Sequence, residues 1–394
     1  MPVLEDLIRL RTTSTPPVDI PGVLHTTYQP DGTRIIEALG GPAEPEEAHQ
    51  LAVDLGITIP TGYIARILEA RHDPAAWHRD NQGDDAVTRP AIRYKLAIEP
   101  ARATLTAPID DLLDLISATR TPTPTTTHPS HVGYVVALGD LQLGKVDQGG
   151  TPTAINHFLS SHQRSLDTYT QYRANNMCGD QVLICWVGDA IEGNQSQGGN
   201  LAAAGRIDLT ITEQVRLYRK LLTRQLLDYA ETGATLTVSI VPGNHDEAER
   251  RGKITRDPHD SWAIEAAMSA ADALDNTPHH ITWVFPQPGD LTTTLTFAGT
   301  RVGTTHGHQI PRGNVSQWLG SMALTRHPIG SVDLLITGHR HQLHTHQHGP
   351  TLHLQIPALE SGSDHHTSSY GGGQPPGLIT LTTHNHTWAN LTHQ

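Results

Sequence analysis

The sequence predicts an α/β fold for most of the chain, and three observations support this class. Short apolar runs rich in Val and Ile, typical of strands buried on both faces, recur from residue 133 onward. Five of these runs end in a side chain that can bind a metal ion, at the strand ends where open α/β sheets place their ligands. Two longer segments, 154–173 and 210–232, carry apolar residues at helical spacing and are predicted to form helices.

Each of the five runs is followed by side chains that carry oxygen or nitrogen. The runs and the residues after them are 135–138 with GDLQ, 182–187 with GDAIEGN, 238–242 with GNHD, 302–305 with HGH, and 332–337 with GHRH. Strand ends at one edge of a sheet lie close together, so these side chains are expected to converge. A single Gly-Asp pair after a strand is usually a turn, so the repetition carries the prediction. Carboxylate, amide oxygen and imidazole together suit divalent first-row metals.

In this order the blocks resemble those of the calcineurin-like metallophosphoesterases. That family's signature is D-x-H, GDxxD or GDxxE, GNH[DE], a strand-end His and GHxH, and the chain shows GDLQ, GDAIEGN, GNHDE, HGH and GHRH. The resemblance runs from Gly133 to the C-terminus. It implies an α/β sandwich of four layers, in which two packed β-sheets are flanked by helices. The chain departs from the signature at Gln142, where most of the family has His.

The resemblance also implies a site for two divalent metal ions. Its ligands, carried over residue by residue, are Asp140, Gln142, Asp189, Asn244, His306, His339 and His341. Asp189 would bridge the ions, and a water between them would become a hydroxide that attacks phosphorus. The two ions carry four positive charges and the two aspartates return two, so the site attracts a phosphate ester. His245 resembles the general acid for the leaving alkoxide, and Asp246 is expected to orient its ring.

Gln142 affects the choice of metal. Its side-chain oxygen is a neutral and harder ligand than imidazole, so the site that it shares with Asp140 and His341 should bind Zn²⁺ less well relative to Mn²⁺ or Mg²⁺. The resemblance includes a manganese-dependent branch with Gln at this position, which cleaves nucleotide diphosphates such as ADP-ribose. We therefore expect Mn²⁺, with Mg²⁺, Zn²⁺, Fe or Ni²⁺ as alternatives.

Further residues beside the motifs are expected to contact the substrate. They are Lys145, Asn194, Arg250, Arg251, His308 and Arg340. The arginines belong to a basic cluster after GNHDE that could hold phosphate or a nucleic-acid backbone, although a solvated helix start is an equal interpretation. Eight histidines fall between 339 and 366. Only His339 and His341 follow a strand in a matching block, so the other six are interpreted as ordinary exposed or hairpin residues.

Residues 1–118 are predicted to form a small, mostly helical accessory domain. The segment 46–55 has one apolar helical face, Gly56 ends it, and Pro60 can open a second helix at 61–71. This resembles a helix-turn-helix that could bind DNA, with an ordinary α-hairpin as the alternative. The stretch 76–100 is predicted to be a β-hairpin, and residues 1–44 receive no assignment. A linker rich in Thr and Pro, 119–131, leads to the metallophosphoesterase domain at 132–394.

Composition limits the functional classes. The formal charge of −13, from 40 acidic and 27 basic residues, argues against a general nucleic-acid coat or a membrane-surface protein. Cys178 and Cys185 are the only cysteines, and Cys185 lies inside an apolar run, so both are interpreted as small buried residues. No apolar run approaches the ~20 residues that cross a bilayer. We therefore expect a cytoplasmic protein with no membrane partner.

Three functional hypotheses follow. The first is a metal-dependent phosphodiesterase or nuclease, favoured by the helix-turn-helix, the arginine cluster and a similarity to bacterial and phage proteins of this layout. The second is a nucleotide diphosphatase or small-molecule phosphatase, favoured by the acidic charge and Gln142. The third is a non-catalytic binding scaffold, which the retained ligands argue against. We favour cleavage of a phosphodiester.

Overall fold

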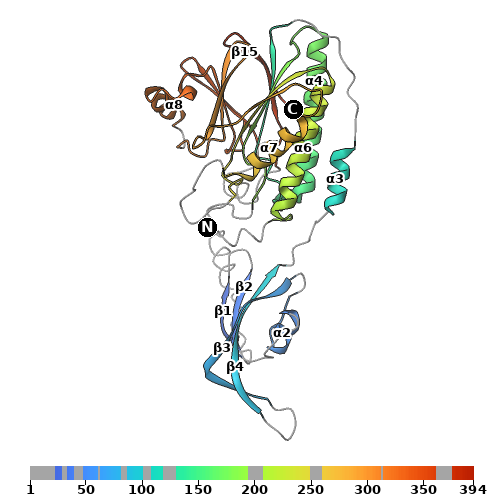
Figure 1. Ribbon diagram of the computed structural model, residues 1–394. Coiled ribbons are helices and arrows are strands. Elements are labelled where there is room, and N and C mark those ends of the chain that lie inside the picture. Colours follow the sequence, from blue (N-terminus) through green and yellow to red (C-terminus); the bar gives the residue numbers. More distant parts are fainter. Residues whose placement is uncertain are drawn as a thin grey trace, which may run out of the picture. The chain divides into compact units, whose positions relative to one another are not determined.

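The computed structural model describes residues 23–28, 33–39, 48–60, 63–80, 87–100, 108–118, 130–193, 207–248, 260–311, 314–360 and 375–394 (Figure 1). The chain divides into two compact units, Met1–Thr104 and Leu105–Gln394. The first unit is built around one hydrophobic cluster and the second around three.

The first unit is an antiparallel β-sheet with a helix packed on it. Its four strands, in spatial order, are β1 (Val23–Tyr28), β2 (Arg34–Leu39), β4 (Val87–Pro100) and β3 (Tyr63–Asp80). Helix α2 (Ala48–Asp54) buries Leu51 and Ala52 in one cluster with Tyr94 and Leu96 of β4. The prediction of a mostly helical N-terminal domain is therefore wrong, although α2 lies within the helix predicted at 46–55.

The predicted helix-turn-helix at 46–71 is also wrong, because its second helix is the first part of β3. Tyr63, Ala65 and Ile67 pack against the core, whereas Ile64 between them is 46% exposed. The side chains thus alternate with the period of a strand. Antiparallel pairing with β4 along nearly the whole length of β3 supplies the hydrogen bonds that decide between strand and helix. The same pair includes the predicted hairpin, 76–100, whose expected turn at 82–85 lies outside the described residues.

The second unit contains two mixed β-sheets. The six strands of the first, in spatial order, are β15 (Thr387–His393), β14 (Ile379–His384), β5 (Gly133–Leu138), β6 (Gln181–Val187), β7 (Thr235–Val241) and β8 (Ile281–Val284). The five strands of the second are β12 (His344–His348), β13 (Thr351–Gln355), β11 (Leu334–Thr337), β10 (Thr300–Thr305) and β9 (Thr292–Phe297). Strands β5 to β8 run parallel, as do β10, β11 and β13. Neighbouring parallel strands therefore end at the same edge of their sheet.

Alternate side chains of the central strands belong to different layers. In β5, Val135 and Ala137 pack between the two sheets, whereas Tyr134 and Val136 face the helices. The helices on that face are α3 (Ile109–Ser117), α4 (Gly150–Ala174, after the 3₁₀ turn η1, Asp147–Gly149), α6 (Ile211–Glu231) and α7 (Trp262–Leu274). Helix α8 (Val315–Leu324) and the 3₁₀ turn η3 (Pro328–Ser331) cover the second sheet. Figure 1 shows α4, α6 and α7 on one side of the sandwich and α8 on the other, so the prediction of two packed sheets flanked by helices is confirmed.

Helix α3 packs within the second unit, although the sequence analysis placed it in the N-terminal domain. Its residues Leu112 and Ile116 are buried in the cluster beneath α4 and α6. The guanidinium of Arg224 on α6 donates a hydrogen bond of 2.6 Å to the carbonyl oxygen of Ile116. The predicted linker at 119–131 lies almost wholly outside the described residues and stays a prediction.

Two further expectations concern single features. Cys178 and Cys185 are both buried as free thiols, and burial raises the pKa of Cys178 to about 12, which makes a reactive thiolate unfavourable. Within the described ranges, no helix combines the length and the apolar character that crossing a bilayer requires.

The packing between the sheets can be tested at Leu354, which is fully buried there. We expect Leu354→Ala to lower the free energy of unfolding of the second unit by about 2–5 kcal/mol, because it leaves a cavity that the surrounding strands fill only in part. The matched control is Leu324→Ala on α8, whose side chain is 87% exposed. Urea denaturation followed by circular dichroism should show a change of ~0.5 kcal/mol or less for the control. Equal effects of the two substitutions would contradict the assigned packing.

Candidate metal centre

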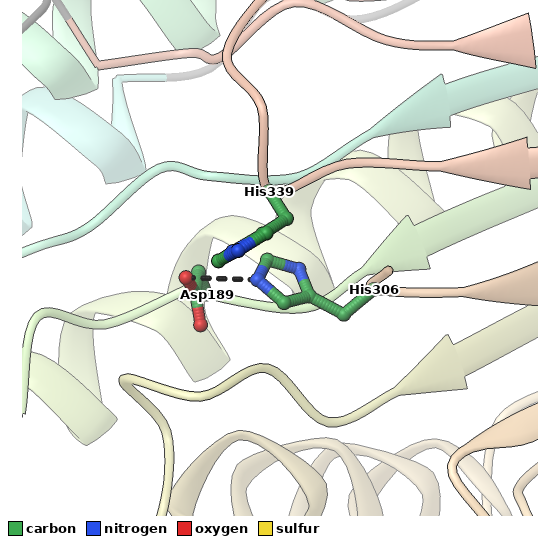
Figure 2. A group of neighbouring side chains, drawn as sticks. All are labelled: Asp189, His306 and His339. Carbon is green, nitrogen blue, oxygen red and sulfur yellow. Dashed lines mark ion pairs between the residues drawn. The ribbon is translucent and has the colours of Figure 1, made fainter. Parts of the chain in front are cut away.

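Five loops at the carboxyl ends of strands build the candidate site. Asp140 follows β5, Asp189 follows β6 and Asn244 follows β7, whereas His306 and His339 follow β10 and β11 of the other sheet. The ligand atoms of Asp189, His306 and His339 all lie within 4.8 Å of one another. Figure 2 shows the imidazole of His306 directed at the Asp189 carboxylate, with the ring of His339 beside both. Side chains from both sheets thus converge on one site.

The first group of converging atoms surrounds Asp189. His306 donates a 2.7 Å hydrogen bond from Nδ1 to the carbonyl oxygen of Val187, so its Nε2 carries the lone pair in the neutral ring. That Nε2 lies 3.0 Å from Asp189 Oδ2 and 3.2 Å from the side-chain oxygen of Asn244. Asp189 Oδ2 receives no conventional hydrogen bond from the described residues. Three acceptors therefore meet at one point, and they need either a proton or a metal cation between them.

The second group joins Asp140 and His341. The Nδ1 atom of His341 lies 2.9 Å from a carboxylate oxygen of Glu360, which fixes the ring and leaves Nε2 as the acceptor. Nε2 faces Asp140 Oδ1 at 3.2 Å, and this oxygen likewise receives no conventional hydrogen bond from the described residues. A carboxylate behind a histidine is the usual support of a metal-binding imidazole. Glu360 was not predicted, because the strand before it, β13, alternates apolar and polar residues and lacks the apolar run that precedes the other site residues.

Gln142 and Lys145 adjoin this second group. The ammonium of Lys145 donates to the side-chain oxygen of Gln142 at 2.9 Å and to the Glu360 carboxylate at 2.7 Å. All three side chains are buried or nearly so. Lys145 was predicted to contact the substrate, and the structure shows it bound to two residues of the site.

His245 faces Asp189 from the β7 loop. Its Nε2 lies 3.9 Å from Asp189 Oδ2, and its backbone N–H donates to Asp189 Oδ1 at 2.8 Å. The Nδ1 atom lies 3.1 Å from the carboxylate of Glu192, which is 6% exposed. Glu192 therefore orients this ring. The sequence analysis missed the residue, although it lies inside GDAIEGN and its motif position was a usable signal.

Asp246 does not orient the ring of His245, contrary to the expectation. Its carboxylate accepts hydrogen bonds from the backbone N–H groups of Asp189, Ile191 and Gly243, at 2.8, 3.2 and 2.9 Å. It is fully buried and ties the β6 loop to the β7 loop. Burial and the neighbouring charge of Asp189 raise its pKa.

The pKa values of the site histidines depend on burial and on the negative charges of the nearby carboxylates. Burial lowers the pKa of His306, but the charges of Asp189 and Asp140 outweigh it and raise the pKa to about 9. His341 is raised in the same way, to a pKa of about 10, by Asp140 and Glu360. The pKa of His339 is lowered to about 4, by burial and by the charge on His306. The carboxylates thus attract cations, and a metal ion would take the place of the protons on His306 and His341.

The backbone is strained at five of the predicted ligands. Asp140, Gln142, Asp189, His339 and His341 have φ between 45° and 69°, a region that bulky L-residues rarely occupy. Each such residue costs on the order of 1–3 kcal/mol. Such strain gathers where function requires a geometry that regular strands and turns do not give.

Residues 133–343 match the sequence model of the calcineurin-like phosphoesterases. The chain belongs to this family. Among solved structures, Vps29 from Entamoeba histolytica in complex with Zn²⁺ is 18% identical, and the match covers 63% of this chain and 84% of that one with a TM-score of 0.28. An archaeal phosphodiesterase is 12% identical, with 66% and 99% covered and a TM-score of 0.30. At these TM-scores the likeness carries no argument, and no curated protein matches the chain.

Two of the remaining predicted site residues of this metallophosphoesterase, His308 and Arg340, lie at the margin of the site. The ring of His308 is centred 5.5 Å from His306 and 6.1 Å from His339. The guanidinium of Arg340 donates to the carbonyl oxygen of Ile310 at 3.4 Å. The other three, Asn194, Arg250 and Arg251, lie outside the described residues.

The close approach of the loops can be tested at Gly243. A Cβ added there would overlap the carboxylate and the backbone nitrogen of Asp189, so Gly243→Ala should displace this residue. We expect the variant to lose the rise in melting temperature that Mn²⁺ gives the parent chain. Gly320→Ala on α8 is the control, because an added Cβ there meets nothing within 4 Å. A full Mn²⁺ response from Gly243→Ala would show that Asp189 does not hold the metal.

Proposed function

We propose that the protein hydrolyses phosphodiesters with the help of two divalent metal ions. The observation that carries the proposal is the convergence of buried acceptors at two points, around Asp189 with His306 and around Asp140 with His341. Buried carboxylates are costly without a compensating charge, and a donor set of carboxylate, amide oxygen and imidazole suits divalent metal ions. The site therefore fits the metal ions that are typical of the family.

The residues that would hold the two ions form two sets that share Asp189. They are Asp189, Asn244, His306 and His339 for one ion, and Asp140, Gln142, Asp189 and His341 for the other. Bound divalent ions of this kind polarise a phosphoryl group and lower the pKa of coordinated water. The chain contributes the orientation of the ligands, because Val187 and Glu360 determine which ring nitrogens face the ions.

His245 is positioned to transfer a proton to a leaving oxygen. Its Nδ1 is engaged by Glu192, and its Nε2 points toward Asp189 and the centre of the site. A proton on Nε2 would serve a strongly basic leaving group, such as the alkoxide of a sugar. A diphosphate bond breaks to give a weakly basic phosphate, which needs no such donor. The placement of His245 therefore supports ester cleavage.

The contacts that Lys145 already makes favour a phosphodiester over a phosphomonoester as the substrate. A phosphomonoester dianion needs more positive charge around its terminal oxygens than a singly charged diester does. Lys145, which was expected to supply such charge, is already bound to Gln142 and Glu360. We propose nucleic acid as the first diester to test. The second helix of the predicted helix-turn-helix is part of strand β3, so the N-terminal unit no longer supports DNA binding. The choice of nucleic acid therefore depends on the second unit alone.

Gln142 favours a second candidate, a manganese-dependent nucleotide diphosphatase. Its neutral oxygen favours Mn²⁺ or Mg²⁺ over Zn²⁺ in one half of the site. In this case the Glu192–His245 pair would position the substrate without donating a proton. We prefer Mn²⁺ as the metal for either candidate.

The deciding experiment compares leaving groups. Metal-free protein is resupplied with Mn²⁺, Mg²⁺, Zn²⁺ or Ni²⁺ and assayed on a dinucleotide and on bis-p-nitrophenyl phosphate. We expect Asp189→Ala to abolish hydrolysis of both. His245→Ala should slow hydrolysis of the dinucleotide by roughly 10²–10⁴-fold, because its alkoxide needs a proton, and should affect the p-nitrophenyl ester far less.

The exposed His280 provides the control, and His280→Ala should leave both rates unchanged. Equal losses on the two substrates in His245→Ala would remove the general-acid role. Turnover of ADP-ribose without turnover of either diester would establish the second candidate. Metal binding without turnover of any of these substrates would favour the third hypothesis, a non-catalytic binding scaffold.

Lys145 should make the two halves of the site unequal in their affinity for metal ions. Its fixed positive charge lies against Gln142 and Glu360, which support the ion at Asp140 and His341, and no lysine is bound in this way at the other half within the described residues. Like charges repel strongly where water is excluded. We therefore infer that the ion beside Gln142 is the more weakly bound of the two.

Removal of the charge tests this asymmetry by metal binding alone. In Lys145→Met the side chain keeps its length and loses its charge, so we expect the weaker of two Mn²⁺ sites to tighten by roughly tenfold or more in calorimetric titration. Lys220→Met, at an exposed position of α6, should leave both affinities unchanged. Weaker binding in Lys145→Met would mean that the lysine chiefly positions Gln142 and Glu360.

A further inference from the structure

A row of histidines lies on one face of the edge strand β12. His344, His346 and His348 occupy alternate positions, so their side chains point to the same face of the strand. His346 pairs directly with His353 of β13, which brings a fourth ring to that face. This is the outer face of the second sheet, because Leu352 and Leu354 on either side of His353 pack between the two sheets.

Two of the three pairs of rings have spacings close to those of imidazoles on a shared ion. Their centres are 4.5 Å apart for His346 and His348, and 5.8 Å apart for His348 and His353. Two imidazoles on one tetrahedral metal have ring centres about 5 Å apart, given metal–nitrogen bonds of ~2.0–2.1 Å. At the catalytic centre the rings of His306 and His339 are separated by 5.0 Å. The ligand nitrogens of the three histidines do not all lie within 4.8 Å of one another, so the exposed ring of His346 must change its side-chain rotamer to complete the set.

One nitrogen of His348 and one nitrogen of His353 are engaged by hydroxyl groups, and the other nitrogen of each ring remains for a metal ion. Nδ1 of His348 contacts the hydroxyl of Ser316 on α8, and Nε2 of His353 contacts the hydroxyl of Thr337 at 2.9 Å. Burial and the neighbouring histidines lower the pKa of His353 to about 4, and the same causes lower that of His348. The rings are therefore neutral near pH 7, as metal ligands must be.

The row is accessible from solvent. His348 and Ser316 line a cavity of about 450 Å³ between α8 and the β12–β13 hairpin. This volume exceeds that of a single ion with its waters. An ion can thus reach the ring of His348 from this cavity, and the exposed ring of His346 from solvent.

We propose that His346, His348 and His353 bind a divalent transition-metal ion on the outer face of the second sheet, apart from the catalytic centre. The set contains imidazole nitrogens and no carboxylate. It should therefore take Ni²⁺, Zn²⁺ or Cu²⁺ and reject Mg²⁺ and Mn²⁺, which prefer oxygen. His344, whose ring centre is 6.1 Å from that of His346, adjoins the site at the open end of the strand.

A bound ion here would act on the edge of the sheet. Among the described strands, β12 lies at the edge of this sheet and pairs with β13, and an edge strand is held to its sheet on one side only. An ion held by His346 and His348 on β12 and by His353 on β13 would fasten the edge strand to its neighbour. The sequence predicts ordinary exposed or hairpin histidines here, because it does not show which rings face one another across the two strands.

The test counts bound metal in the full chain. Parent protein is titrated with Ni²⁺ by calorimetry beside the double variant His346→Thr, His348→Thr, in which threonine preserves the strand preference. We expect the parent to bind one more equivalent of Ni²⁺ than the double variant, and the two to bind Mn²⁺ equally. Hydrolytic activity with Mn²⁺ should be unchanged.

The control removes two histidines elsewhere. His279 and His280 are adjacent in sequence and precede β8, so His279→Thr with His280→Thr should keep the additional Ni²⁺ equivalent. Equal Ni²⁺ stoichiometry in all three chains would overturn the proposal. The single variant His346→Thr, at the most exposed of the three ligands, should also lose the equivalent and guards against misfolding of the double variant.

Discussion

The structure of the second unit depends on the burial of two aspartates that face other acceptors. Asp140 and Asp189 are at most 1% exposed, and the oxygens that face His341 and His306 receive no conventional hydrogen bond from the described residues. An unpaired buried carboxylate costs several kcal/mol. The chain reduces this cost with backbone donors, since the N–H of His339 binds Asp140 and that of His245 binds Asp189. The remaining negative charge is what gives the site its affinity for cations.

The two halves of the site are supported by different means. The carbonyl of Val187 fixes His306, so that half has no additional charge behind its imidazole. Glu360 fixes His341 and carries a negative charge, but Lys145 lies against the same carboxylate. A glutamine at 142 fits this arrangement, because a side-chain oxygen can accept a hydrogen bond from a lysine while a second lone pair faces a metal. An imidazole ligand at this position has no lone pair left for the lysine.

The sequence predicts the candidate metal ligands better than it predicts the residues that hold those ligands in place. Strand-end residues could be recognised because parallel strands bring their ends together, and the structure places Asp189, His306 and His339 within one cluster. The contact of Glu360 with His341 depends on loop conformation, which the sequence does not show. Glu192 does occupy the last position of the GDxxE motif, but the motif does not tell that its carboxylate lies against His245. The segment 61–71 is predicted as a helix because Gly56 can end one helix and Pro60 can open another, whereas the pairing with β4 selects the strand.

The strain in the site loops is offset by two large apolar cores, one between the sheets and one beneath the helices. Left-handed φ at several predicted ligands, together with contacts in which Gly243 leaves no room for a Cβ beside Asp189, raises the energy of the folded state locally. The cost is met by apolar packing elsewhere, between the sheets and beneath the helices, at positions that never touch the site. A looser arrangement would relieve the backbone, but it would separate Asp189 from His306 and let water hydrate the carboxylates. The attraction for cations would then fall, so the strain in the loops and the concentration of negative charge have the same structural origin.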